Sequence, residues 1–404
     1  MPWNRTAPAK ERLKFVLEWE ERWQAGEGRV NLSELCRELG ISRETAYVWL
    51  RRYRESGHDV EALVERSHRP HHIPNQVPQA IADVLVAARK YRPTWGPRKL
   101  RAHLIARNPG TSFPSESAIA AILQRNGLTQ LSRRRRRRLV VPATRPFAAA
   151  TGPNAVWCVD FKGWFRTRDG QRCYPLTLLD AYSRYLLRCE ALVDPDTRNV
   201  EPIFDSAFQE FGTPEAIRSD NGPPFASTGA GGLTALSVWW QRLGIRHDRI
   251  TPGKPQQNGR QERFHRTLAE LAQHPERDVR TQQRAFDRFR YEYNQERPHE
   301  ALGLKPPHSA YAPSPRRYPR PLERFADDSH ARFRVDRHGY IRWQRRRVFI
   351  STALVYEDVF VDPDPSPGQR WEVRWGPSGG HLLLGWIDER RPDRGLVLPS
   401  RRRR

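Results

Sequence analysis

Six consecutive arginines, residues 133–138, separate two stretches of the chain whose apolar residues follow different periods. A run of this kind cannot pack into a core, because permanently charged side chains would have to leave water together. Before the run, apolar residues recur with the spacing of helices. From Pro153 onward they form short alternating stretches bounded by turn residues, as in strands. The sequence therefore predicts helical N-terminal domains and an α/β domain after the arginine run.

Two short helices are predicted within residues 1–66. Apolar residues at 32, 35, 36 and 39 share one helix face, Asn31 begins this helix and Gly40 ends it. A second helix starts at Ser42, buries its own apolar face and leaves a basic face exposed. This pattern is typical of a helix-turn-helix whose second helix enters the DNA major groove, although an ordinary helical hairpin would share it. The residues expected to contact DNA from this helix are Arg43, Tyr47, Arg51 and Arg52.

Residues 67–130 predict a second domain that resembles a helix-turn-helix. Helices are expected over residues 81–88, from Pro97 and from Ser115 onward. The arginine run then falls in a linker, residues 131–152, and we expect it to lie on DNA phosphates; a merely solvated linker is the alternative. The DNA contacts expected from this region are Arg98, Lys99, Arg133, Arg134, Arg135, Arg136, Arg137 and Arg138.

Residues 153–312 predict one α/β domain. Three apolar runs of strand length come first, and helices then alternate with strands. The order βββαβαβα predicts a mixed five-stranded sheet flanked by helices, which is the architecture of an RNase H-like domain. The expected strands are residues 155–161, 174–179, 185–192, 216–218 and 245–250, and the first two expected helices cover residues 200–211 and 233–243.

The C-terminal part of the chain predicts a small β-barrel. A proline-rich linker, residues 313–330, is followed by short strands with turn residues between them over residues 331–390. Residues 391–404 end in four arginines and are expected to form a basic tail.

Charge and composition exclude several classes of protein. Lys and Arg outnumber Asp and Glu by 70 to 46, and the resulting net charge of +24 favours a polyanionic partner such as DNA. No apolar stretch approaches the roughly 18 residues of a membrane-spanning helix, so a cytoplasmic, nucleoid-associated protein is expected. The four cysteines are scattered without a CxxC pair, which argues against both a disulfide framework and a structural zinc site.

Three carboxylates are candidates for catalysis. Asp160 lies inside an apolar strand, where a carboxylate is costly unless a cation compensates it. Asp220 follows the fourth strand, and Glu262 lies on the helix after the fifth. The first and fourth strands of an RNase H-like sheet are neighbours, so we expect the three carboxylates to converge and to bind two Mg²⁺ or Mn²⁺ ions. Asp180 and Asp248 are weaker candidates, because Asp180 is better suited to cap a turn.

Three motifs carry a resemblance to a known family. WCVDFK (157–162), SDNGPPF (219–225) and TPGKPQQNGRQERFHRTL (251–268) resemble the integrase core of bacterial insertion-sequence DDE transposases, relatives of retroviral integrases. The resemblance covers nearly the whole chain and implies that the three carboxylates are the metal-binding triad. The last two of them are separated by 41 residues, where the family has roughly thirty-five. The surplus is expected in the glycine-rich loop 227–232, which could bulge without moving the helix.

The resemblance implies a transposase that cleaves DNA at the ends of an insertion sequence and joins the 3′ hydroxyl groups to target DNA without ATP. Its DNA partners would be the terminal inverted repeats and the target. Joining two ends implies a homodimer or larger oligomer on DNA, and an accessory ATPase is left open. Two alternatives stand beside it: a catalytically inactive DNA-binding regulator, and an RNase H-like nuclease without strand transfer. The basic residues expected to hold phosphates beside the triad are Lys254, Arg260 and Arg263.

Overall fold

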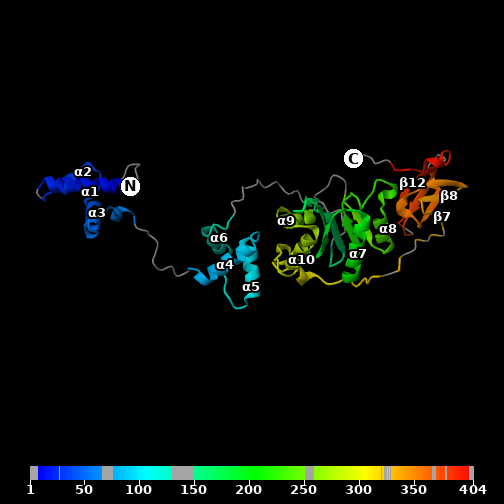
Figure 1. Ribbon diagram of the computed structural model, residues 1–404, viewed down its shortest axis with the longest axis horizontal. Coiled ribbons are helices and arrows are strands. Elements are labelled where there is room, and N and C mark those ends of the chain that lie inside the picture. The colour runs from blue at the N-terminus through cyan, green and yellow to red at the C-terminus, as the bar shows by residue number, and fades with distance from the viewer. Residues whose placement is uncertain are drawn as a thin grey trace. The chain divides into compact units, whose positions relative to one another are not determined.

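The computed structural model of the chain describes residues 8–26, 28–65, 76–129, 150–250, 259–319, 321–322, 325, 327, 329–365, 370–377 and 380–399. The chain divides into two compact units, Met1–Val77 and Pro78–Arg404 (Figure 1). The arginine run 133–138 and Lys254 lie outside the described residues, as does the side chain of Arg260. Among the described helices, none is both long enough and apolar enough to cross a membrane.

The first unit is a small helical bundle that contains the predicted helix-turn-helix. Its helical segments are α1 (Pro8–Ala25), α2 (Leu32–Glu38), α3 (Arg43–Glu55) and the 3-10 turn η1 (Val60–Leu63). Asn31 and Ser42 cap α2 and α3 by accepting a backbone N–H three residues further on, as predicted. The sequence pattern does not predict α1, which completes the core by burying Phe15, Val16 and Trp19 against α2 and α3.

The second unit begins with the three helices that the sequence predicts. They are α4 (Gln79–Tyr91), α5 (Pro97–Arg107) and α6 (Glu116–Arg125). Leu85, Leu100 and Ile122 are buried between them. Val84, which the pattern places on the buried face of α4, is 43% exposed. The apolar stripe of α4 is therefore narrower than predicted.

Ion pairs attach this three-helix bundle to the α/β domain. Arg92, at the end of α4, is buried and pairs with Glu292 and Glu296 of α10 (Val279–Gln295). Arg107 approaches the same Glu296, with 2.7 Å between the guanidinium nitrogen and the carboxylate oxygen. Two arginines of the bundle thus pair with two glutamates of α10, and these ion pairs hold the bundle beside that helix.

A mixed sheet forms the centre of the α/β domain. Its strands are β1 (Val156–Phe161), β2 (Phe165–Arg166), β3 (Arg172–Asp180), β4 (Leu186–Leu192), β5 (Ala216–Ser219) and β6 (Arg246–Arg249). The order β4-β3-β1-β5-β6 gives the five predicted strands, and the two-residue β2 adds to the start of β3. β1 pairs with β3 in antiparallel and with β5 in parallel orientation.

Helices cover both faces of this sheet (Figure 1). α7 (Thr197–Phe211) and α8 (Ala235–Arg242) pack on one face, where Trp157 and Phe208 lie in the same core. α9 (Gly259–Gln273) and α10 pack on the other, where Phe264 and Phe286 are buried with Leu179. The first and fourth predicted strands are therefore neighbours, and the last predicted helix packs beside the first strand, as expected of an RNase H-like fold.

The C-terminal strands form an antiparallel sheet and a separate hairpin. The sheet has the order β13-β12-β11-β10-β7, and the hairpin pairs β8 with β9. The strands are β7 (Ala331–Arg334), β8 (Tyr340–Trp343), β9 (Arg346–Phe349), β10 (Asp358–Pro363), β11 (Arg370–Trp375), β12 (Leu382–Asp388) and β13 (Leu396–Val397).

Three predictions about this part of the chain need correction. Among the described strands, no pairing joins the hairpin to the sheet to close a barrel; Trp343 and Val348 of the hairpin instead pack into the core of the sheet. The predicted tail 391–404 is structured up to residue 399, because β13 pairs with β12. The start of the predicted linker 313–330 packs on the α/β domain, where Tyr318 contacts Phe208.

The glycine-rich loop 227–232 binds the C-terminal sheet instead of bulging into solvent. Ala230, Leu233 and Val238 belong to the same buried cluster as the strands of that sheet. Gly231 has a φ of +62°, and a Cβ atom there would lie 2.8 Å from Leu382 Cδ2. The surplus residues between β5 and α9 thus form a docking surface for the C-terminal domain.

We predict that Gly231→Ala loosens this docking. The substitution forces an alanine into the left-handed region and against Leu382, so the free energy of unfolding should fall by about 1–3 kcal/mol. Gly229→Ala is the matched control, since its Cβ would meet only Ser227 Oγ at 3.5 Å and its φ is ordinary. Urea unfolding of both variants measures the difference. Equal stabilities would contradict the docking contact.

Two buried histidines predict acid sensitivity of the second unit. Burial lowers the pKa of His247 to about 4 and that of His299 to about 3, with help from Arg249 and Arg297 respectively. Both side chains titrate near pH 6.5 in an unfolded chain. The stability contributed by their neutral forms is therefore complete above about pH 6.5 and falls as the pH drops toward the folded pKa values. At about 1.4 kcal/mol per pKa unit, the loss reaches several kcal/mol.

Calorimetric melting at a series of pH values measures this loss. His299→Gln removes one titrating group, so the melting temperature of this variant should depend less steeply on pH below about 6.5. His338→Gln, at an exposed turn, is the control and should follow the unsubstituted chain. If the His299→Gln variant lost as much stability at low pH as the unsubstituted chain does, His299 would not be a cause of the acid sensitivity.

Candidate functional site

Asp160 and Asp220 lie at the same end of the sheet, near the carboxyl ends of the neighbouring parallel strands β1 and β5. β1 and β5 pair in parallel register, with Val156 opposite Ala216 and the same offset of 60 residues along the ladder. Two residues beyond the last pair, this offset places Asp160 opposite Asp220. Neighbouring strands lie about 4.8 Å apart. The two carboxylates therefore share one edge of the sheet, although they are far apart in the sequence.

The first turn of α9 is attached to β1 beside this edge. Gln261 is buried, and its Nε2 donates a hydrogen bond of 2.9 Å to the carbonyl oxygen of Cys158. One turn later, His265 Nδ1 lies 3.9 Å from Asp160 Oδ2. Glu262 stands between these two contacts in the sequence, and its side chain is exposed. The helix that carries Glu262 is thus held against the strand that carries Asp160.

Thr177 links His265 to the same strand. Its Oγ1 donates to the carbonyl oxygen of Asp160 at 3.0 Å and lies 3.1 Å from His265 Nε2. A hydroxyl has one proton, so Nε2 is the donor in the second hydrogen bond. Burial, with Lys162 as the second cause, lowers the pKa of His265 to about 4. A neutral ring that donates through Nε2 presents an acceptor, Nδ1, toward the Asp160 carboxylate.

Asp220 is held in a turn at the end of β5. The backbone N–H of Gly222 donates to its Oδ1 at 3.3 Å, and Asn221 Nδ2 donates to the carbonyl oxygen of Ile250 at 2.6 Å. Burial raises the pKa of Asp220, and the Gly222 hydrogen bond opposes this shift. A carboxylate that loses water in this way gains stability from a nearby cation.

The two competing carboxylates have structural partners. Asp180 is fully buried and accepts hydrogen bonds from the backbone N–H groups of Asn154 at 2.8 Å and Ser183 at 2.7 Å, and from the Ser183 hydroxyl at 2.6 Å. It caps the turn after β3, as predicted. Asp248 pairs with Arg246 at 2.8 Å and with Arg218 at 3.7 Å. Both carboxylates are therefore occupied in holding the sheet.

The predicted DNA-contacting residues of α3 differ in their surroundings. Arg43, Tyr47 and Arg51 are exposed. Arg52 is half-buried, donates a 2.9 Å hydrogen bond to the carbonyl oxygen of Val64, and lies 5.0 Å from the ring centre of Trp49. Arg52 therefore fastens η1 to α3, whereas the other three side chains present a free face.

The basic residues that were predicted to contact DNA from α5 and α9 also differ in their exposure to solvent. Arg98 is exposed and lies 3.8 Å from Glu116. Lys99 is half-buried, and burial together with Arg297 lowers its pKa. Arg263, on α9 beside Glu262, is exposed. Lys99 thus faces the α/β domain, while Arg98 and Arg263 remain accessible to solvent.

Sequence reasoning missed four residues at this edge: Gln261, His265, Thr177 and Lys162. Two of them could have been found, because Gln261 and His265 are one helical turn apart on either side of Glu262. Thr177 carries no such signal, since its contact with Asp160 depends on the register of β1 with β3. Lys162 follows Asp160 by two residues inside the WCVDFK motif.

Comparison with known families identifies both halves of the chain. Models of the integrase core domain match residues 150–255 and 243–307. A helix-turn-helix domain matches residues 11–71, and a homeodomain-like domain matches residues 45–123. The matched ranges fall on the helical bundles and on the α/β domain described above.

Among relatives, the insertion element IS407 uncharacterized 31.7 kDa protein of Burkholderia multivorans is 28% identical over 69% of this chain and 90% of its own length. The insertion element IS476 uncharacterized 39.2 kDa protein of Xanthomonas euvesicatoria is 29% identical over 59% of this chain and 66% of its own length. A solved HTLV-2 integrase catalytic core domain in complex with magnesium aligns with a TM-score of 0.32 and 16% identity, over 40% of this chain and 99% of that one. The chain is thus similar to insertion-element proteins, and its helix-turn-helix matches precede its integrase core matches.

Proposed function

We propose that the chain is a transposase that binds the ends of an insertion sequence, cleaves DNA there and joins the ends to target DNA. The observation that carries the proposal is the parallel β1–β5 register, whose continuation by two residues leads to Asp160 and Asp220. The attachment of α9 to β1 through Gln261 supports Glu262 as the third member of the site. The insertion-element relatives and the integrase core matches support the reaction class.

The donor set of this site fits Mg²⁺ or Mn²⁺. Both ions prefer oxygen ligands, and carboxylates at one edge of a sheet provide them. Asp220 is half-buried and accepts a long hydrogen bond from the Gly222 N–H, so it is a carboxylate that a cation would stabilise. We propose that Asp160, Asp220 and Glu262 hold two such ions. When bound, the ions supply charge stabilisation and activation of an oxygen nucleophile.

The residues of the chain position the DNA for an exchange of phosphodiester bonds. The 3′ oxygen of an element end forms a bond to a target phosphorus, and the bond from that phosphorus to its neighbouring nucleotide oxygen breaks. The number of phosphodiester bonds is unchanged, so the exchange needs no ATP. Lys162 and Arg263 flank the carboxylates and would bind the phosphates on either side of the reacting one. Gln261 and His265 keep α9 and β1 aligned while the DNA binds.

Recognition of the element ends falls to the helical domains in this proposal. Arg43, Tyr47 and Arg51 lie on the exposed face of α3, the second helix of the helix-turn-helix, and this helix would enter the major groove. Their side chains can contact base edges and phosphates together. Because two element ends must be joined in one event, a homodimer or larger oligomer on DNA follows from the reaction.

We predict that Asp160→Asn, Asp220→Asn and Glu262→Gln each abolish strand transfer. The three variants should still bind DNA. Each substitution removes one negative charge from the proposed ion site and leaves the shape of the side chain almost unchanged. The assay incubates the chain with Mg²⁺ and labelled DNA carrying the terminal repeats of the element, and measures joined products and DNA retention separately. Losses of at least about 1,000-fold are expected for a missing metal ligand.

Glu201→Gln is the matched control for Glu262→Gln. Glu201 is also an exposed helical glutamate, but it lies on α7, which covers the opposite face of the sheet. This variant should join DNA as the unsubstituted chain does. Joining by the Asp160→Asn chain would refute the proposed site. Retention of DNA with neither cleavage nor joining by the unsubstituted chain would indicate the inactive regulator, and cleavage without joining would indicate the nuclease.

A further inference from the structure

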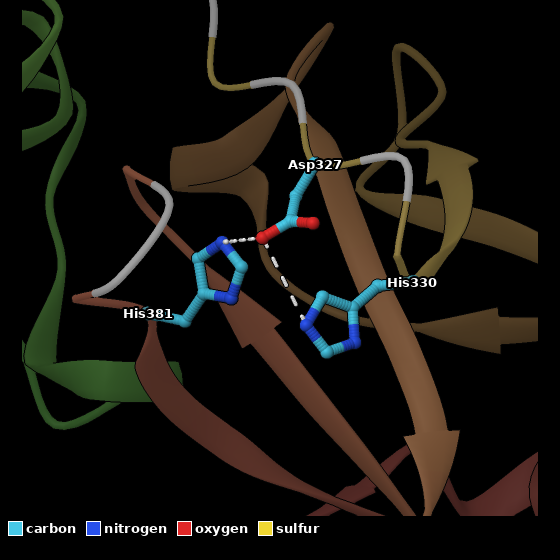
Figure 2. Close-up of side chains that lie close together, drawn as sticks. All are labelled: Asp327, His330 and His381. Atoms are coloured by element: carbon cyan, nitrogen blue, oxygen red, sulfur yellow. Dashed lines mark ion pairs between the residues drawn. The ribbon is translucent and has the colours of Figure 1, made fainter.

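Two histidines and an aspartate converge in the C-terminal domain, away from the carboxylate edge (Figure 2). Asp327 precedes the sheet, His330 directly precedes β7, and His381 directly precedes β12. One oxygen or nitrogen from each side chain lies within 4.8 Å of the others. Figure 2 shows both rings turning a nitrogen toward the same Asp327 oxygen. Residues from three separate segments therefore face one point.

The separations within this cluster are too long for hydrogen bonds. Asp327 Oδ2 lies 3.8 Å from His330 Nε2 and 3.7 Å from His381 Nε2. A direct N–H···O bond would bring these atoms to about 2.9 Å. Ligands of a tetrahedral zinc ion, bonded at about 2.0–2.2 Å, lie about 3.4 Å apart. The two separations from Asp327 exceed this ligand spacing by only a few tenths of an ångström, and the three ligand atoms, which lie within 4.8 Å of one another, would close around an ion by side-chain rotation.

Neighbouring residues contact two of the three candidate ligands, His330 and Asp327. His330 lies opposite Asp362 by continuation of the β7–β10 register, and its Nδ1 is 2.8 Å from Asp362 Oδ2. This contact is an ion pair without hydrogen-bond geometry, because Asp362 Oδ2 accepts no hydrogen bond within the described part of the chain. A small rotation of the ring would make it the histidine–carboxylate contact that directs Nε2 toward a metal ion. The backbone N–H of Ser329 donates to Asp327 Oδ1 at 3.1 Å, and the Ser329 hydroxyl donates to the same oxygen. Asp327 Oδ2 is thereby left to face the rings.

The Nε2 atom of His381 independently indicates a binding partner at this point. Its side chain is only 7% exposed and stacks on Phe360 at 4.6 Å between ring centres. Nε2 of this ring is buried and makes no hydrogen bond within the described part of the chain. A buried polar nitrogen without a partner is costly.

We propose that Asp327, His330 and His381 bind one zinc ion, with water in the fourth position. Imidazole nitrogens and a carboxylate suit zinc, and imidazole nitrogens do not suit Mg²⁺. The ion would join the segment before β7 to the start of β12, two places that lie 51 residues apart in the chain. β7 is an edge strand of the sheet, so this link would secure the edge. The role is structural and independent of the carboxylate site.

The test is zinc binding by the full chain after removal of metal with a chelator. Excess Mg²⁺ is present to occupy carboxylate sites, and zinc is measured by elemental analysis after dialysis and by calorimetric titration. The unsubstituted chain should retain one more equivalent of zinc than Asp327→Asn, and zinc should raise the melting temperature of the former alone. Asp362→Asn keeps all three ligands and should weaken binding by about 10- to 100-fold.

His338→Ala is the matched control, because His338 is an exposed histidine of the same domain. It should retain zinc. His381→Ala should lose the ion; if this variant fails to fold, Asp327→Asn and Asp362→Asn decide the question. Cobalt provides a second reading, since a four-coordinate cobalt ion should give visible absorption in the unsubstituted chain and not in Asp327→Asn. Equal zinc in the unsubstituted and Asp327→Asn chains, or displacement of the zinc by Mg²⁺, would overturn the proposal.

Discussion

The parallel pairing of β1 with β5 is the constraint on which the candidate active site depends. A slip of one residue would turn the whole side-chain pattern of a strand to the other face, so the offset of 60 residues is fixed by burial on both faces. Trp157 and Ile217 lie in the core under α7, and this fixes the register. The same register that buries these two side chains leads, two residues further on, to Asp160 and Asp220. The position of the carboxylates is thus a consequence of packing.

The elements predicted correctly are those whose signal is local. Strands β1, β3 and β4 are apolar runs between turn residues, and α2, α3 and α6 have capping side chains at their first turns. The helices α1 and α10 were missed for one physical reason: each buries a narrow apolar stripe in an otherwise charged segment. In α10 the buried aromatic residues are Phe286 and Tyr293, two turns apart. Such a stripe is recognisable only when the surface it packs against is known.

The residues of the two candidate sites also divide into those that a local motif indicates and those that only tertiary contacts bring together. Asp160, Asp220 and Glu262 lie in recognisable motifs, so their residues could be named from the sequence alone. Their expected convergence depends on strand order, which was predicted from the order of strands and helices along the chain and not from any local pattern. No sequence spacing indicated the cluster of Asp327 with His330 and His381, because its third member comes from another hairpin of the sheet. Contacts of this kind arise from tertiary pairing and are invisible to any local pattern.

The loop 227–232 links the turn that holds Asp220 to the C-terminal sheet. Its extra residues were expected to be a passive bulge, yet Ala230 is buried against the C-terminal sheet. The loop follows the turn that holds Asp220 and precedes α8, whose Arg242 forms an ion pair with Glu357. Docking of the C-terminal sheet therefore restrains the chain on the far side of the Asp220 turn. Loosening that contact would release a restraint on the candidate site, because the turn and the docking loop are consecutive segments of one short connection.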